Sequence, residues 1–106
     1  MKESEFQKKV IDEIEERLPG AIVMKNDPNY IQGIPDLTVL YKDRWAALET
    51  KRSEKAKRRP NQSYYVNKMN EMSYSAFIYP ENMEETLNAM ERSFKARRTS
   101  RNTKPK

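Results

Sequence analysis

GIPDLTVLYKDRWAALETK, residues 33–51, is the stretch that decides the fold of this chain of 106 residues. Apolar and polar side chains alternate on both sides of Asp43-Arg44, as they do where two strands point successive side chains to opposite faces. The pattern predicts a tight β-hairpin with strands at 36–42 and 45–51.

The register of this hairpin determines which side chains share a face. With a loop of two residues, or of any even number, residues whose numbers sum to 87 oppose each other, so Asp36 would face Lys51 and Thr38 would face Glu49. Alternation then puts these four polar side chains on one face. The other face carries a mostly apolar set that suits the core: Leu37, Val39, Tyr41, Ala46, Leu48 and Thr50. An odd-length loop would break this arrangement.

The segment before the hairpin predicts one helix and one short strand. Residues 4–18 repeat apolar side chains at helical spacing after Ser4, the expected N-cap: Phe6, Val10, Ile11, Ile14 and Leu18. Pro19-Gly20 ends this helix. A short apolar strand follows at 21–25, and a loop rich in turn formers, at 26–35, delivers the chain into Asp36.

The segment after the hairpin predicts a helix, a strand and a last helix. A basic connection at 52–59 leads to Pro60, which suits the first turn of a helix reaching about Met72. The stripe expected to be buried on it comprises Tyr65, Val66, Met69 and Met72. A strand at 74–79 precedes a helix from about Glu81 with an apolar stripe of Met83, Leu87, Met90 and Phe94.

This order of elements predicts an α/β fold with a mixed sheet flanked by helices. The first three strands would form a meander, and the fourth would join through a helical crossover, which favours a parallel neighbour. Length indicates one domain, residues 1–98, followed by a basic tail at 99–106 that we expect to be disordered in isolation.

Composition narrows the location and the chemistry. No apolar run approaches the roughly 20 residues that cross a bilayer, and the first residues, MKESEFQ, lack the apolar centre of a signal peptide. Cysteine is absent, which excludes disulfides and thiolate chemistry and fits an intracellular protein. Histidine is also absent, so acid–base or metal chemistry must use carboxylates, lysine, tyrosine or metal-bound water.

The net charge of +5 is unevenly distributed. Residues 92–106 contain seven Lys or Arg and no acid, and removing them leaves 14 basic against 16 acidic residues. A second basic cluster covers 51–59. This asymmetry suggests that particular regions engage a polyanion, most simply nucleic acid.

The shared polar face of the hairpin suggests how a phosphodiester would be cut. Asp36 and Glu49 would be diagonal neighbours with Cα atoms about 7–8 Å apart, so their carboxylates can converge on one hard cation. Lys51 emerges on the same face, where it would orient the attacking water or neutralise phosphate charge. Carboxylates and lysines on a strand are also common as solvated salt bridges, and the basic segment nearby favours the catalytic interpretation.

These residues resemble a known family. Ile34-Pro35-Asp36 followed by Glu49-Thr50-Lys51 is similar to the PD-(D/E)xK nuclease signature. Residues 33–37, the downstream Glu-x-Lys-Arg and a glutamine opening the next helix most resemble VRR-NUC domains, whose small stand-alone members come from phages and bacteria. The resemblance covers roughly residues 3–80.

The resemblance implies a restriction-endonuclease-like α-β-β-β-α-β core with a C-terminal helix, and a Mg²⁺- or Mn²⁺-dependent nuclease site. Asp36, Glu49 and the carbonyl of Thr50 would bind the metal, and Lys51 would be the catalytic lysine. An acid on the first helix and a glutamine on the helix after the motif would complete the site. Glu5 and Gln62 occupy those places, although a glutamate at a helix start also complements the helix dipole.

The stand-alone relatives resemble Holliday-junction resolvases, which implies a homodimer acting on branched DNA such as four-way junctions, in a bacterial cytoplasm or phage-infected cell. Phosphate contacts are expected from the basic segment and from the start of the tail: Arg52, Lys55, Lys57, Arg58, Arg59, Arg97 and Arg98. Three interpretations of the tail stay open: contact with DNA, contact with RNA, or a flexible end without a nucleic-acid contact. The alternative from another class is a non-catalytic nucleic-acid-binding module on a nuclease-like fold.

Overall fold

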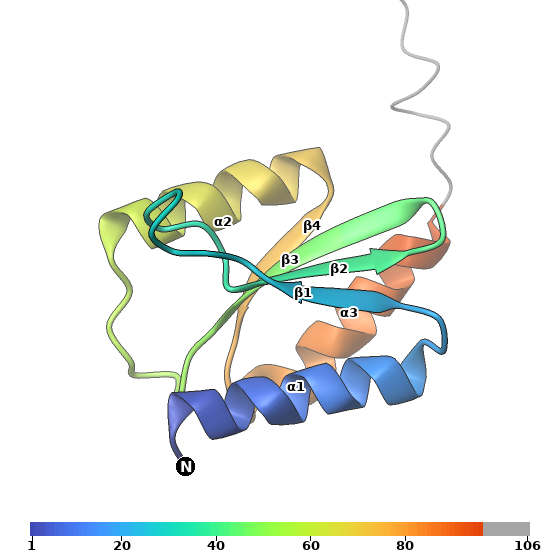
Figure 1. Ribbon diagram of the computed structural model, residues 1–106, viewed down its shortest axis with the longest axis horizontal. Coiled ribbons are helices and arrows are strands. Elements are labelled where there is room, and N and C mark those ends of the chain that lie inside the picture. Colours follow the sequence, from blue (N-terminus) through green and yellow to red (C-terminus); the bar gives the residue numbers. More distant parts are fainter. Residues whose placement is uncertain (97–106) are drawn as a thin grey trace, which may run out of the picture.

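The computed structural model describes residues 1–96, which form three α-helices and four strands (Figure 1). In chain order they are α1 (Glu3–Arg17), β1 (Ile22–Lys25), β2 (Leu37–Tyr41), β3 (Arg44–Thr50), α2 (Pro60–Met72), β4 (Tyr74–Ile78) and, after a 3-10 turn (Pro80–Asn82), α3 (Met83–Lys95). The predicted order of helices and strands is confirmed. Arg97, Arg98 and the tail at 99–106 lie outside the described residues.

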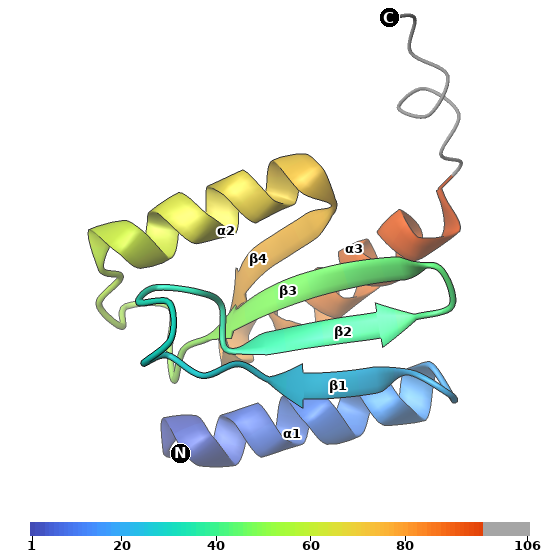
Figure 2. The ribbon, with the colours of Figure 1, turned by 45° about the horizontal axis from the view of Figure 1, so that its top comes forward.

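The four strands form one mixed sheet in the order β1-β2-β3-β4. β1, β2 and β3 pair antiparallel, and β4 lies parallel to β3 after the crossover through α2 (Figure 2). The expected meander and the expected parallel neighbour are therefore both present. Within residues 1–96, no helix is both long and apolar enough to span a bilayer.

Helices cover both faces of the sheet. α1 and α3 lie against one face, and α2 lies against the other, over β3 and β4 (Figures 1 and 2). The face toward α1 and α3 holds the main core, built from side chains that are at most 8% exposed: Phe6, Val10, Ile14, Leu18, Leu37, Val39, Ala46, Leu48, Ile78, Leu87, Met90 and Phe94. The alternation predicted for the hairpin thus puts the core side chains on one face, whereas the opposite face mixes the polar Thr38 and Glu49 with the apolar Leu40, Trp45 and Ala47.

The predicted register of the hairpin is wrong by two residues. Leu37 pairs with Leu48 and Tyr41 with Arg44, so opposed residue numbers sum to 85, and the turn is Lys42-Asp43. Lys42 has a φ of 57°, the left-handed conformation that lets a two-residue turn close the hairpin. A shift of two leaves every side chain on its predicted face.

Two details of the helices also differ from prediction. Ser4 is not the N-cap of α1: the helix begins at Glu3, and the backbone N–H of Lys2 donates to Glu5 at 2.8 Å. The stripe predicted on α2 is buried at Val66 alone, and Met72 is 55% exposed. α2 packs mainly on β4 and β3, and much of its surface faces away from the sheet.

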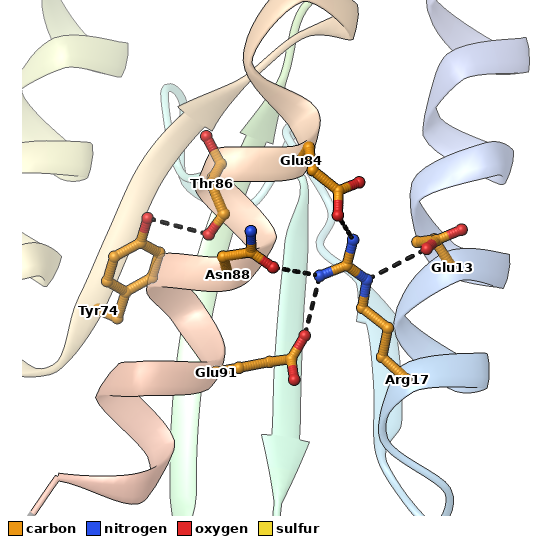
Figure 3. Close-up of polar contacts among 7 residues, drawn as sticks. All are labelled: Glu13, Arg17, Tyr74, Glu84, Thr86, Asn88 and Glu91. Atoms are coloured by element: carbon orange, nitrogen blue, oxygen red, sulfur yellow. Dashed lines mark hydrogen bonds and ion pairs between the residues drawn. The ribbon is translucent and has the colours of Figure 1, made fainter.

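A guanidinium group ties α1 to α3 on the core face of the sheet. Figure 3 shows Arg17 extending from α1 toward three side chains of α3. It donates to Asn88 and Glu91 at 2.9 Å and to Glu84 at 2.8 Å, while its Nε donates to Glu13 at 3.1 Å. The Arg17 side chain is only 14% exposed, so these charge-assisted bonds fix the two helices relative to each other.

Candidate metal centre

The polar residues of the hairpin motif gather at one end of the sheet. Asp36 directly precedes β2 and Lys51 directly follows β3; because these strands are antiparallel, the start of one lies beside the end of the other. The β2–β3 ladder begins with the pair Leu37 and Leu48, so the next pair along the same register is Asp36 and Glu49. These two residues are therefore directly opposite each other, which is closer than the diagonal placement predicted from the sequence. Gln62 enters from the first turn of α2.

The loop before Asp36 is held in a defined shape. The Asn26 side chain donates to the carbonyl of Pro35 at 2.8 Å and to the Thr38 hydroxyl at 2.9 Å, and its backbone N–H donates to the Asp36 carbonyl at 2.7 Å. Gly33 has a φ of +91°, and a Cβ there would lie 2.8 Å from the backbone carbonyl carbon of Asn61. The glycine therefore allows the loop to lie directly against the start of α2.

Asp36 is oriented by the end of β3. Its Oδ2 accepts the backbone N–H of Thr50 at 3.1 Å and the Thr50 hydroxyl at 2.5 Å. Gln7 of α1 donates to the same hydroxyl oxygen at 3.4 Å. The second carboxylate oxygen, Oδ1, accepts no hydrogen bond from residues 1–96 and is available to a ligand.

Glu49 is a buried carboxyl group that lacks one partner. The residue is 2% exposed; its Oε2 accepts Gln62 Nε2 at 3.1 Å, and its Oε1 has no hydrogen-bond partner among the described residues. The pKa of this carboxyl is raised to about 8, first by burial and then by the charge of Asp36, while the Lys51 ammonium acts in the opposite direction. Its charged form therefore needs a further positive partner.

The Gln62 side chain connects Lys51 with Glu49. Lys51 Nζ donates to Gln62 Oε1 at 2.9 Å and stands 3.9 Å from Glu49 Oε2, and Lys51 is only 7% exposed. The Arg59 backbone N–H donates to the same Gln62 oxygen at 3.0 Å, which fixes the amide orientation. The amide thus holds Lys51 on one side and Glu49 on the other.

A hard divalent cation fits this arrangement. Glu49 Oε1 and Asp36 Oδ1 are carboxylate oxygens without hydrogen bonds, and oxygen ligands of this kind suit Mg²⁺ and Mn²⁺. The Thr50 carbonyl was expected as a third ligand. In the part of the chain that the structure describes, no three acidic side chains group closely enough to bind a metal together. Water would complete the coordination, as Mg²⁺ commonly retains several water molecules.

The structure does not bring Glu5 to this group. Its carboxylate accepts the backbone N–H of Lys2, and no hydrogen bond or ion pair within residues 1–96 joins it to the hairpin residues. Glu3 is the acid of α1 whose charge contributes to the raised pKa of Glu49. Glu5 was predicted from the sequence, and Glu3 was missed. Helical spacing could have identified Glu3, because it precedes the buried Phe6 and Val10 by three and seven residues and so lies on their side of the helix, whereas Glu5 does not.

The basic segment 52–59 runs from the site to α2, and its residues take two roles. All five cations of the segment are exposed, as phosphate contacts would require: Arg52, Lys55, Lys57, Arg58 and Arg59. Arg58 lies over the Phe77 ring at 4.1 Å from its centroid, and Tyr79 is also close, at 5.8 Å. This cation–π contact attaches the segment to β4 and leaves Arg58 partly committed to the protein.

Comparisons of this chain with protein-family models, with curated proteins and with solved structures found no match.

Proposed function

We propose that this protein is a Mg²⁺- or Mn²⁺-dependent DNA endonuclease of the PD-(D/E)xK type, similar to VRR-NUC domains. One observation carries the proposal: Asp36, Glu49, Lys51 and Gln62 gather at one end of the sheet, and the buried Glu49 keeps an unpartnered oxygen beside Asp36. A buried carboxyl group with an unpaired oxygen and a strongly raised pKa is costly unless a ligand completes it, and it is therefore a functional-site candidate.

The architecture supports the same proposal. A restriction-endonuclease-like core consists of α-β-β-β-α-β elements with the signature on the second and third strands, and the present order of elements agrees with it. The acid that precedes β2, the Glu-Thr that ends β3 and the Lys51 that follows it support the resemblance to that signature.

Asp36 and Glu49 would hold the cation with the Thr50 carbonyl. When bound, the cation would lower the pKa of a water molecule and offset negative charge at the phosphate. Lys51 would donate a hydrogen bond to the attacking water or to a phosphate oxygen. The water oxygen would form a bond to phosphorus and release a proton to solvent, the bond to the leaving sugar oxygen would break, and that oxygen would take up a proton from solvent.

Gln62 acts as a positioning residue. Its amide oxygen accepts from Lys51 and its amide nitrogen donates to Glu49, so it sets the direction of both groups. Groups that orient metal ligands in this way commonly contribute about 10- to 100-fold to metal affinity or activity. Gln62→Ala is therefore expected to weaken the nuclease without abolishing it.

The charges beside the site support nucleic acid as the substrate class, and the resemblance to Holliday-junction resolvases suggests its branched form. The exposed basic residues of segment 52–59 would bind phosphates on both sides of the cut, which gives affinity without reading sequence. We propose branched DNA, such as a four-way junction, as the substrate. Symmetric cutting of such a junction needs two sites and hence a homodimer, acting inside a bacterial or phage-infected cell.

A second candidate is a non-catalytic nucleic-acid-binding module. The observation that favours it is the missing third carboxylate: residues 1–96 contain no cluster of three acids at the site. The intact Asp36, Glu49 and Lys51 favour the enzyme, since a binding module has no use for a buried carboxyl group with an unmet oxygen.

A cleavage panel distinguishes the two. Labelled single-stranded, duplex, flap and four-way-junction DNA would be incubated with the protein and Mg²⁺, Mn²⁺ or EDTA, and cuts mapped on each strand. We expect metal-dependent cuts, paired across a four-way junction, that Asp36→Ala and Lys51→Ala abolish and the exposed control Lys68→Ala does not change. Binding of DNA without cleavage under either metal would favour the module.

Light scattering at the assay concentration tests the resolvase version separately. A dimer is expected. A monomer that still cuts DNA would leave the nuclease in place and exclude symmetric junction resolution by one homodimer.

A further inference from the structure

We propose that Tyr30, at the tip of the loop between β1 and β2, stacks on an unpaired base of the bound nucleic acid. This inference rests on the proposed function only in placing nucleic acid at this end of the sheet. Beyond the proposed function, the inference names what the loop recognises. This is a nucleotide that has left the duplex stack, next to the phosphate at the metal centre.

The first observation is the exposure of the ring. Tyr30 is 85% exposed, the most exposed of the large hydrophobic side chains in residues 1–96. No hydrogen bond, ion pair or ring contact within the described residues involves its side chain. An aromatic ring of this kind gains nothing from the folded chain and offers a flat face to a partner.

The second observation is that the loop which carries the ring is held in place. Asp27 accepts the backbone N–H of Asn29 at 2.9 Å on its side chain and that of Tyr30 at 3.2 Å on its carbonyl. The Ile34 N–H donates to the Ile31 carbonyl at 3.3 Å, and the Gly33 backbone lies against Asn61. The ring is thus presented from a loop with a defined shape, so ordering it on binding costs less entropy.

The third observation is where this loop lies. It ends at Asp36, and it meets α2 at Asn61, immediately after the point where the basic segment 52–59 enters the helix. Figures 1 and 2 show both connections beside the N-terminal half of α2. Tyr64, 58% exposed, follows Asn61 by three residues on the same helix, and its ring packs edge-on against that of Tyr65. Exposed aromatic rings therefore accompany exposed cations around one site.

This combination identifies the occupant. Cations that follow a backbone together with aromatic rings on which bases stack are the means by which proteins bind single-stranded nucleic acid. A base in an intact duplex already has both faces covered by its neighbours. The ring therefore favours single strands, forks and branch points, where a base has left the stack.

Binding measured in EDTA tests this without depending on cleavage. Fluorescence anisotropy would give the Kd of the full chain for oligothymidylate and for a blunt duplex, at several salt concentrations. We expect Tyr30→Ala and Tyr30→Leu to weaken single-strand binding about 5- to 150-fold, since base–ring stacking contributes about 1–3 kcal/mol per base. Tyr30→Phe and Tyr30→Trp should restore it, and duplex binding should change less than about twofold.

The controls separate stacking from charge and from folding. Ile22→Ala removes another exposed apolar side chain, 58% exposed on β1, and is expected to leave the Kd unchanged. Tyr30→Ala should not alter the salt dependence, whereas Arg59→Ala should reduce its slope by about 0.7 for a single strand. Thermal unfolding of each variant, followed by circular dichroism, should match the wild type.

Three results would overturn the inference. They are an unchanged single-strand Kd in Tyr30→Ala, an equal loss for single strand and duplex, and full activity of Tyr30→Leu. If Tyr30→Ala instead abolished self-association, the ring would belong to a protein contact. Absence of cleavage together with the expected binding pattern would reject the nuclease proposal and leave this inference standing.

Discussion

Glu49 carries an electrostatic cost that the fold alone does not offset. Its carboxyl group is buried beside Asp36, and in the absence of a cation its pKa stands near 8 instead of 4.5. The folded protein therefore keeps this proton at neutral pH, and a cation that binds there must displace it. A proton and a metal ion are alternative partners for the same oxygen.

This competition gives a prediction about metal-free stability. The unfolded carboxyl releases its proton near pH 4.5 and the folded one near 8, so between these values the folded state binds more protons. The contribution of Glu49 to stability is fully present below pH 4.5 and is lost as the pH rises toward 8, by about 1.4 kcal/mol per pH unit. Glu49→Gln, which cannot titrate, should not lose this stability.

Urea unfolding in EDTA across this pH window measures the effect. The free energy of unfolding of the wild type, relative to Glu49→Gln, should fall as the pH rises. If the free energies of unfolding of the two proteins changed with pH in parallel, the Glu49 carboxyl group would not be shielded from water. The raised pKa that marks the site would then be absent.

At the scale of the elements, the hairpin shows what a sequence pattern can and cannot predict. Alternation identified both strands and both faces, because the side-chain period of two is visible in the residues themselves. The register was missed because the turn is Lys42-Asp43, with Lys42 in a left-handed conformation that lysine does not signal. Glycine or asparagine at that position would have marked the turn.

The loop against α2 yields a prediction with an internal control. Gly33→Ala places a methyl group 2.8 Å from the Asn61 backbone, whereas Gly20→Ala has a similar φ of +94° and no atom within 4 Å. Both substitutions carry the left-handed strain, of about 1–2 kcal/mol. Only Gly33→Ala adds overpacking, so denaturant unfolding should show it less stable than Gly20→Ala by about 1–3 kcal/mol. Equal losses would mean that the loop yields without cost.

The contact between α1 and α3 yields a second element-scale prediction. Arg17→Ala removes four hydrogen bonds that join a side chain only 14% exposed to both helices, and should lower the free energy of unfolding by about 1–3 kcal/mol. Lys8→Ala removes an exposed pair with Asp12 and should cost less than about 0.5 kcal/mol. Similar thermal midpoints for both variants would contradict this ranking.

At the scale of the whole molecule, the sequence predicted the order of the elements and the topology of the sheet. It did not predict which charged side chains lie close together in space. The acid of α1 illustrates the reason. Glu3 and Glu5 are both in the first turn, and which of them acts on Glu49 depends on the exact start of the helix and its rotation over the sheet. Burial of Glu49 likewise depends on how α2 covers β3, which no local pattern contains.

The described chain ends far from the candidate metal centre along the sheet. Arg44, next to the hairpin turn, donates to the carbonyls of Ser93 and Ala96, whereas Asp36 lies at the other end of β2. If the basic residues after Ala96 contribute phosphate contacts alone, a protein that stops at Ala96 should bind DNA more weakly and with a smaller salt slope, but keep the wild-type kcat. A lower kcat at saturating DNA would show that the basic tail takes part in the chemistry.

The claim that connects these residues to a function is that Asp36 and Glu49 together hold a divalent cation. Titration of the protein with Mn²⁺, followed by electron paramagnetic resonance above the Glu49 pKa of about 8, measures this directly. We predict saturable binding to the wild type that is lost in both Asp36→Asn and Glu49→Gln and retained in Glu5→Gln. Mn²⁺ binding that is absent from the wild type, or unchanged in the two carboxylate variants, would contradict the account.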